Sequence, residues 1–155
     1  MSTIQVIREK IIQELPLWDQ PSISVGVVKE GEVILAEGFG YADQEKNLKA
    51  NQETLYQIGS CSKAFTAAAA ALLVDQGKLE WDRPVHEYLP WLEFKDPYTT
   101  AHATVRDLLC HRTGLPRHDA YWINGPCSRR EMVENLRNME PVWSFRSHWC
   151  YQNTC

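Results

Sequence analysis

Residues 64–74 form a stretch of the chain with no polar face. Thr66 is the one polar side chain between Ala64 and Val74. A helix that is apolar on every side is usually buried on all sides in a core. Gly77 follows at the position where a left-handed residue commonly ends a helix. The pattern therefore predicts a buried helix over residues 60–76, around which the rest of the chain is organised.

The first forty residues show two other periodicities. Ile4, Ile7, Ile11 and Leu15 recur at helical spacing, which predicts an amphipathic surface helix over 3–17, ended near Pro16. Two runs rich in valine and isoleucine follow, separated by the turn sequence Lys29-Glu30-Gly31-Glu32. They predict an antiparallel hairpin over 23–41. The polar residues 44–53 are expected to form a loop.

The region 79–140 is predicted to be mostly helical but irregular. Residues 79–92 indicate an extended connection with a short helical turn at 85–88, and residues 94–102 are expected to be a loop because of Asp96-Pro97. Two capping boxes mark helix starts, Thr104 with Asp107 and Ser128 with Glu131. The second helix should end before Pro141.

Composition restricts the possible partners. The 155 residues have the length of one ordinary domain, and 44% apolar with 23% charged residues is typical of a globular protein. A net charge of −4 gives no electrostatic footprint for nucleic acid. No run reaches the ~18 apolar residues of a membrane span. The N-terminus shows no recognisable export signal, which favours the cytoplasm and leaves a periplasmic or extracellular location open.

The cysteines are expected to be free thiols. They are five in number, an odd count, and no Cys-x-x-Cys pair occurs. They are Cys61, Cys110, Cys127, Cys150 and Cys155. A zinc site can be imagined from six residues of this region, which are Cys110, His111, His118, Cys127, His148 and Cys150. The close ligand spacing of structural zinc sites is lacking, so we predict no metal and no cofactor.

Ser60 and Lys63 stand at the start of the apolar helix, one turn apart. Residues three apart share a helix face, roughly 5–6 Å between their Cβ atoms. A serine hydroxyl becomes a good nucleophile when a neighbouring base removes its proton. A lysine can be that base when it is neutral, the form that burial and the positive end of a helix both favour. The alternative is that Ser60 or Ser62 caps the helix while Lys63 is solvated.

Three blocks of sequence together resemble the serine β-lactamase-like family, which includes class C β-lactamases, DD-peptidases and related esterases. They are Tyr56-Gln57-Ile58-Gly59-Ser60-Cys61-Ser62-Lys63-Ala64-Phe65-Thr66, then 77–90, then Thr104 to Pro116 with Leu108-Leu109-Cys110-His111 at its centre. The resemblance covers about residues 20–153. It implies an α+β, β-lactamase/transpeptidase-like fold: an antiparallel sheet flanked by helices with a helical subdomain. The chain would be the N-terminal portion of one such domain, truncated before its C-terminal strands.

The resemblance also assigns residues near the end of the chain. Family members place Tyr-x-Asn at about this distance, which matches Tyr151 and Asn153. There the tyrosine shares a proton relay with the lysine, and the asparagine holds the substrate's carbonyl. Gln152 replaces the usual serine, and the Pro-Gly expected upstream is Pro141-Val142. The block that contains His111 buttresses the active site in the family, so His111 and His118 are expected to be structural.

Two functions follow from these patterns. The first is a serine hydrolase that forms an acyl-enzyme on Ser60, with Lys63 as base and Tyr151 in the relay, on amide, ester or β-lactam substrates. The second is a truncated or pseudoenzymatic chain without turnover, with a binding or assembly role. The family's third motif, which supplies an oxyanion donor, lies beyond Tyr-x-Asn and is not found by residue 155. Expected partners are a small-molecule or peptide substrate, and also the remaining half of the domain or a second copy.

Overall fold

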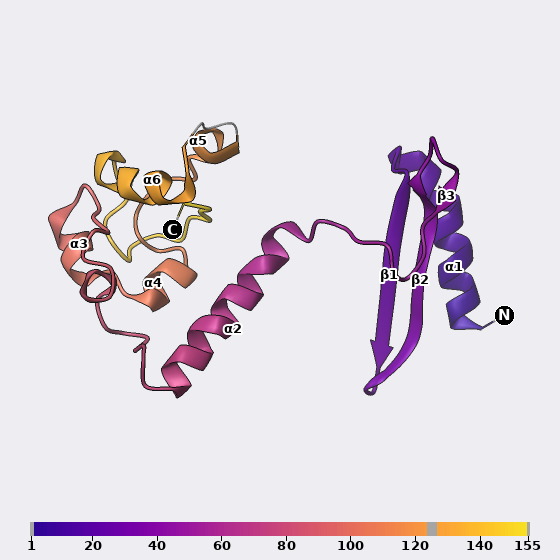
Figure 1. Cartoon of the computed structure of the whole chain (residues 1–155), viewed down its shortest axis with the longest axis horizontal. Helices are drawn as coiled ribbons and strands as arrows, with labels where there is room; N and C mark the ends of the chain where they lie inside the picture. Colours follow the sequence, from indigo (N-terminus) through magenta and orange to yellow (C-terminus); the bar gives the residue numbers. More distant parts are fainter. Residues whose placement is uncertain (1, 124–126, 155) are drawn as a thin grey trace. The chain divides into compact units, whose positions relative to one another are not determined.

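The computed structural model describes residues 2–123 and 127–154, without the side chains of Ala120 and Trp122. The free thiol expected at Cys155 lies outside the described residues. The chain forms two compact units, Met1–Gly59 and Ser60–Cys155, and each is considered by itself. Figure 1 traces both.

A helix opens the first unit. α1 (Thr3–Glu14) is capped by Ser2, whose side chain accepts a hydrogen bond from the Gln5 amide. The predicted helix over 3–17 is therefore present, but its last turn is the 3₁₀ helix η1 (Leu15–Trp18), with Pro16 in its first turn. The side chains of the predicted apolar stripe are half-buried, and α1 lies beside β2 (Figure 1).

The predicted hairpin is confirmed as the pair β1 (Ser22–Lys29) and β2 (Glu32–Asp43). The two strands are antiparallel, and Lys29 pairs with Glu32 across a two-residue turn. Glu30 and Gly31 in that turn have φ values of 53° and 87°, the mirror-image turn geometry that suits strand twist. A third strand, β3 (Leu48–Lys49), pairs with β2 inside the segment expected to be loop.

The apolar helix is present as α2 (Ser62–Asp75), preceded by the 3₁₀ turn η2 (Gly59–Cys61). Gly77, at φ 67°, ends it as predicted, with the Gly77 amide donating to the Val74 carbonyl and the Lys78 amide to the Leu73 carbonyl. This is the Schellman pattern.

The predicted burial of this helix is wrong for the described structure. No residue of α2 is buried, and Phe65 is 70% exposed. The reason lies in the core of the second unit, which is built from later segments that do not include α2. Its buried residues are Val85, Leu92, Phe94, Ala103, Leu115, Leu136 and Met139. Apolar composition shows which surface of a helix can be buried. Whether that surface is buried depends on whether another segment packs against it.

The rest of the second unit is a set of short helices. They are η3 (Val85–Glu87), α3 (Pro97–His102), α4 (Val105–Leu109), α5 (Asp119–Ile123), α6 (Arg129–Glu134) and η4 (Asn135–Asn138). The turn predicted at 85–88 and both capping boxes are confirmed. The loop expected over 94–102 is wrong, because Asp96 caps α3 by accepting from the Tyr98 and Thr99 amides and Pro97 takes the first helical position.

A buried carboxylate joins three segments of this unit. Asp107, fully buried, accepts hydrogen bonds from Thr104 in its capping box and from the guanidinium groups of Arg112 and Arg146. Burial alone would raise the pKa of Asp107, but the hydrogen bonds from Arg146, Thr104 and Arg112 outweigh it and hold that pKa well below its usual range. The Arg146 amide also donates to the Arg112 carbonyl at 2.9 Å.

Replacing this carboxylate should destabilise the second unit. Asp107→Asn leaves two guanidinium groups without their counter-charge. Because these groups remain partly exposed, we expect a loss of about 3 kcal/mol, the low end for a broken buried pair. Urea unfolding at pH 7 measures it. The loss should shrink below about pH 4, where the unfolded carboxyl takes up its proton.

Asp82→Asn is the matched control, since Asp82 pairs with Arg106 at the surface and is 69% exposed. It should cost much less stability than Asp107→Asn, because an ion pair at the surface is screened by solvent. Equal losses in the two variants would contradict a structural role for the buried carboxylate.

Candidate active site

Ser60 and Lys63 come together at the N-terminus of α2. Ser60 lies in η2 and Lys63 in the first turn of α2, and Lys63 Nζ is 3.1 Å from Ser60 Oγ. The capping alternative is wrong, because the N-cap residue is Cys61 and no side chain caps the helix. Lys63 is half-buried rather than solvated. The local helix geometry thus brings the Lys63 amine within hydrogen-bond distance of the Ser60 hydroxyl.

Tyr151 and Asn153 reach the same two side chains from about ninety residues further along the chain. The Tyr151 hydroxyl lies 2.5 Å from Ser60 Oγ, and Lys63 Nζ donates to Asn153 Oδ1 at 2.6 Å. Lys63 Nζ also lies 4.7 Å from the centre of the Tyr151 ring. The structure therefore brings together all four residues that the sequence singled out.

The Tyr151 phenol lies in a field that favours its ionised form. Its pKa is lowered, first by Lys63 and next by the hydrogen bond with Ser60, with a smaller contribution from the charge of Arg117. Partial burial opposes the shift without reversing it. A phenol of lowered pKa beside a serine hydroxyl is suited to accept that hydroxyl's proton.

Gln152 fixes the segment that carries Tyr151 and Asn153. Its side chain is fully buried; Oε1 accepts from the Thr113 hydroxyl at 3.0 Å, and Nε2 donates to the Leu115 carbonyl. The sequence showed only that a glutamine stands where the family usually has a serine. The longer amide spans the distance to the 113–115 segment and satisfies both of its polar ends there.

His111 supports the same segment from its main chain and its ring. Its carbonyl accepts from the Cys150 amide at 3.0 Å, and its Nδ1 accepts from the Gln152 amide at 3.3 Å. The His111 and Tyr151 ring centres are 4.7 Å apart. Burial, and then the nearby Lys63, lower the pKa of His111. These contacts agree with the structural role expected for His111. The His118 carbonyl accepts from the Tyr121 amide at the start of α5.

Two charged residues that the sequence did not single out also contact the site. Asn153 Nδ2 donates to Asp119 Oδ1 at 3.4 Å, and the Arg117 guanidinium carbon lies 5.4 Å from the centre of the Tyr151 ring. Arg117 and Asp119 form an ion pair at 2.7 Å. Arg117 and Asp119 belong to no sequence motif that would have predicted their place at the site.

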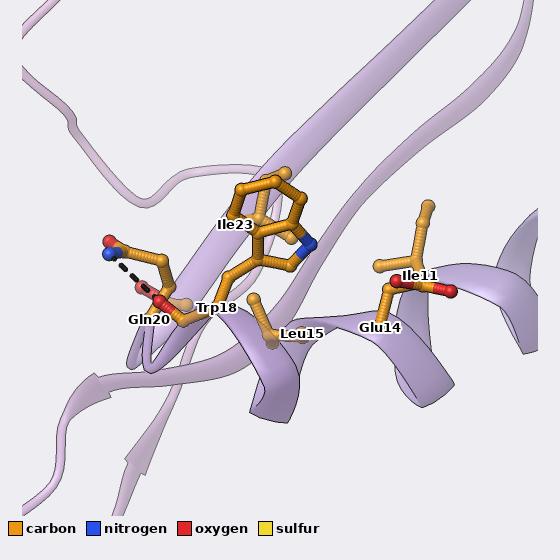
Figure 2. Close-up of a pocket in the computed structure, with 7 residues that line it drawn as sticks. Ile11, Glu14, Leu15, Trp18, Gln20 and Ile23 are labelled. Atoms are coloured by element: carbon orange, nitrogen blue, oxygen red, sulfur yellow. Dashed lines mark hydrogen bonds between the residues drawn. The ribbon is translucent and has the colours of Figure 1, made fainter.

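A separate apolar hollow of about 510 Å³ lies in the first unit (Figure 2). Ile11, Leu15 and Trp18 line it together with Ile23 at the start of β1, and the Gln20 side chain donates to the Trp18 carbonyl at 3.4 Å. All of its lining residues belong to Met1–Gly59, whereas the four site residues belong to Ser60–Cys155. The hollow is therefore not formed by the candidate catalytic residues.

Two further observations apply to the described part of the chain. Within residues 2–123 and 127–154, no three or more His, Cys, Asp or Glu side chains gather into a metal-binding group. None of the helices described there is long and apolar enough to cross a membrane.

An α+β fold with a serine and a lysine at the start of one helix defines a class of serine hydrolases, and comparison with known proteins identifies the family. Residues 10–154 match the Beta-lactamase family model. The chain belongs to this family of β-lactamase-like serine hydrolases and has its fold, with a small antiparallel sheet and helices.

Relatives within the family have different activities. The chain is 34% identical to the unguisins hydrolase ungD′ of Aspergillus campestris over 96% of its own length and 29% of that protein. An octameric penicillin-binding protein homologue from Pyrococcus abyssi matches 99% of the chain and 36% of its own, with 30% identity and a TM-score of 0.86. The D-amino acid amidase of Ochrobactrum anthropi, complexed with D-phenylalanine, matches at 25% identity with a TM-score of 0.77 over 99% and 42%. The chain thus spans about a third of the length of these relatives.

The lowered pKa of His111 predicts a pH dependence of stability. Between the folded and the unfolded pKa, the unfolded state binds more protons, so the free energy of unfolding should fall as pH drops below about 6.5. His111→Asn should remove this dependence while keeping an acceptor for the Gln152 amide, and asparagine tolerates the φ of 55° at this position. Urea midpoints from pH 5 to 8 measure the effect.

His102→Asn is the control, since His102 lies in α3 and its ring contacts the Tyr98 carbonyl instead. Its pH dependence should follow the parent chain. If His111→Asn kept the full pH dependence, the assignment to His111 would be wrong.

Proposed function

We propose that this protein is a hydrolase that forms an acyl-enzyme on Ser60, with Lys63 as base, Tyr151 in the proton relay and Asn153 binding the substrate's carbonyl. The observation that carries the proposal is the position of one serine oxygen within 3.1 Å of an amine and 2.5 Å of a phenol. A serine activated by an adjacent base is the recurring arrangement of acyl-transfer enzymes.

The proton of Ser60 is proposed to pass to Lys63 and Tyr151 acting as a pair. A neutral amine beside a phenol and an ammonium beside a phenolate contain the same number of protons and differ only in where one of them lies. The fall in the Tyr151 pKa brings the two arrangements closer in free energy. Either arrangement leaves one group of the pair able to accept a proton as Ser60 Oγ attacks.

Attack forms the bond between Ser60 Oγ and the substrate's carbonyl carbon and gives a tetrahedral intermediate. The pair then returns the proton to the leaving nitrogen or oxygen as that bond breaks, and a water molecule hydrolyses the ester on Ser60. The amide nitrogen of Asn153 has two hydrogens, so it can donate to a substrate carbonyl as well as to Asp119.

The proposed substrates are small molecules or peptides that contain an amide, ester or β-lactam bond. Support comes from the family, whose members include a hydrolase of unguisins and an amidase of D-amino acids. We further propose that the two units belong to one catalytic domain, since a single family model matches residues 10–154 across both.

A second candidate function is a chain that does not turn substrate over alone and instead binds a complementing segment or a second copy. The observation that favours it is the exposure of the apolar helix, with Phe65 70% and Leu72 60% exposed. An octameric assembly of one relative is consistent with self-association. Removal of one oxyanion donor costs roughly 10²–10³-fold in other hydrolases. Among the residues that the structure describes, the family resemblance suggests one such donor, the Ser60 amide.

Labelling with a fluorophosphonate probe tests the nucleophile. The probe's mass should appear on the peptide that contains Ser60, should be lost in Ser60→Ala and should be retained in Ser62→Ala, the matched control two residues away. Lys63→Met should slow labelling by roughly 10²–10⁴-fold, the usual cost of losing an acid–base group.

Labelling that persists in Ser60→Ala and maps to Ser62 would overturn the assignment. The same preparations separate the two candidate functions. Ester or nitrocefin hydrolysis that disappears in Ser60→Ala supports the enzyme, whereas labelling without turnover supports the second function.

A further inference from the structure

Arg117 and Asp119 contact the proposed catalytic residues without belonging to the four predicted ones. We propose that they are a positioning pair, in which Asp119 fixes the orientation of the Asn153 amide and Arg117 holds a permanent positive charge beside the Tyr151 phenol. The inference rests on the proposed function, because the two residues would act through Asn153 and Tyr151.

Asp119 gives the Asn153 amide one preferred orientation. Lys63 Nζ meets Asn153 Oδ1 at 2.6 Å, and the Asp119 carboxylate meets Asn153 Nδ2 at 3.4 Å. A flipped amide would turn its NH₂ group toward the amine and its oxygen toward the carboxylate, and both contacts would be repulsive when those groups are charged. The acceptor therefore stays aimed at Lys63, and the second N–H hydrogen keeps a fixed direction for a substrate carbonyl.

Arg117 places a positive charge next to the Tyr151 phenol. Its guanidinium carbon lies 5.4 Å from the centre of the Tyr151 ring, and a guanidinium stays protonated throughout the working pH range. The ion pair with Asp119, whose closest atoms are 2.7 Å apart, holds the long side chain in place. The charge of Arg117 contributes to lowering the pKa of Tyr151, after the larger effects of Lys63 and Ser60.

Two titratable groups, Lys63 and His111, also lie beside the Tyr151 phenol. Lys63 Nζ, from α2, lies 4.7 Å from the centre of the Tyr151 ring, and the centre of the His111 ring lies 4.7 Å from it as well. Lys63 is assigned to proton transfer, and His111 is bonded through Nδ1 to the Gln152 amide. Arg117 is therefore suited to supply a constant positive field while the relay changes its charge.

The backbone explains why these two residues reach the site. Leu115 is buried and its carbonyl accepts from Gln152 Nε2, so the chain leaves the anchored 113–115 segment right beside Tyr151. His118 adopts a φ of 49°, a left-handed conformation that redirects the chain between Arg117 and Asp119. α5 then begins at Asp119.

The test measures the Tyr151 titration directly, independently of catalysis. Tyrosine ¹³Cζ signals of the full chain are followed by NMR from pH 6 to 11, with Tyr151 assigned through Tyr151→Phe. Arg117→Gln should move the Tyr151 midpoint to higher pH, and Arg117→Lys should restore most of the original value because it returns the charge. The shift should shrink as salt is raised, since an exposed charge is screened. Arg130→Gln, which removes an arginine that lies over Trp91, is the control.

The second readout is the pH profile of Ser60 labelling by the fluorophosphonate probe. Arg117→Gln should move this profile to higher pH in parallel with the Tyr151 midpoint. Asp119→Asn, which can face the Asn153 amide in either orientation, should slow labelling by about tenfold, as expected for losing a hydrogen bond to a charged group.

The outcomes separate this inference from the proposed function. An Arg117→Gln chain whose Tyr151 midpoint equals that of Arg130→Gln would overturn the role of Arg117, whether or not Ser60 reacts. An Asp119→Asn chain that labels at the parent rate would overturn the role of Asp119. A parent chain that never labels at Ser60 would contradict the proposed function, while the NMR titration would still decide whether Arg117 sets the Tyr151 environment.

Discussion

The candidate site depends on one buried amide. Tyr151 and Asn153 lie in a segment with no helix or strand to hold it, and the Gln152 side chain between them is bonded to Thr113 and Leu115 inside the second unit. A buried amide left without these partners would cost the full desolvation of its polar atoms. That cost fixes the segment in register, so its two outer side chains point at Ser60 and Lys63.

Ion pairs of Asp107 hold the same two segments together a few residues away. Asp107 binds Arg112, which adjoins the anchoring segment, and Arg146, which precedes Tyr151 by five residues. The segments 111–115 and 146–152 are thus tied to each other by a buried carboxylate and by a buried amide. Arg117 and Asp119 follow shortly after the 111–115 segment in the chain. The chemistry proposed for Ser60 therefore depends on polar contacts between two loops as much as on the helix that carries the serine.

The sequence predicted the elements whose signals are local. The hairpin follows from its two runs rich in valine and isoleucine and from the turn between them. The helix starts follow from Ser128 and Thr104, and the Ser60–Lys63 pair from helical spacing. Tyr151 and Asn153 come from family resemblance alone. Local signals failed where a partner decides the outcome. The apolar composition of α2 does not show that Phe65 is exposed. Asp96-Pro97 is typical of a loop, yet here Asp96 caps a helix. Long sequence separations divide three further residues from their partners, namely Gln152, Arg117 and Asp119. Residue spacing does not predict such contacts.

Hydrogen exchange at two backbone amides tests the central claim most directly. The amides of Cys150 and Gln152 donate to the carbonyl and the ring of His111. If the buried amide holds this segment, their protection should lie within about tenfold of that of the Val85 amide, which bonds to Ala103 in the core, and Gln152→Leu should lose that protection while Val85 keeps it. Exchange of both amides at the rate of an unstructured peptide in the parent chain would contradict the account.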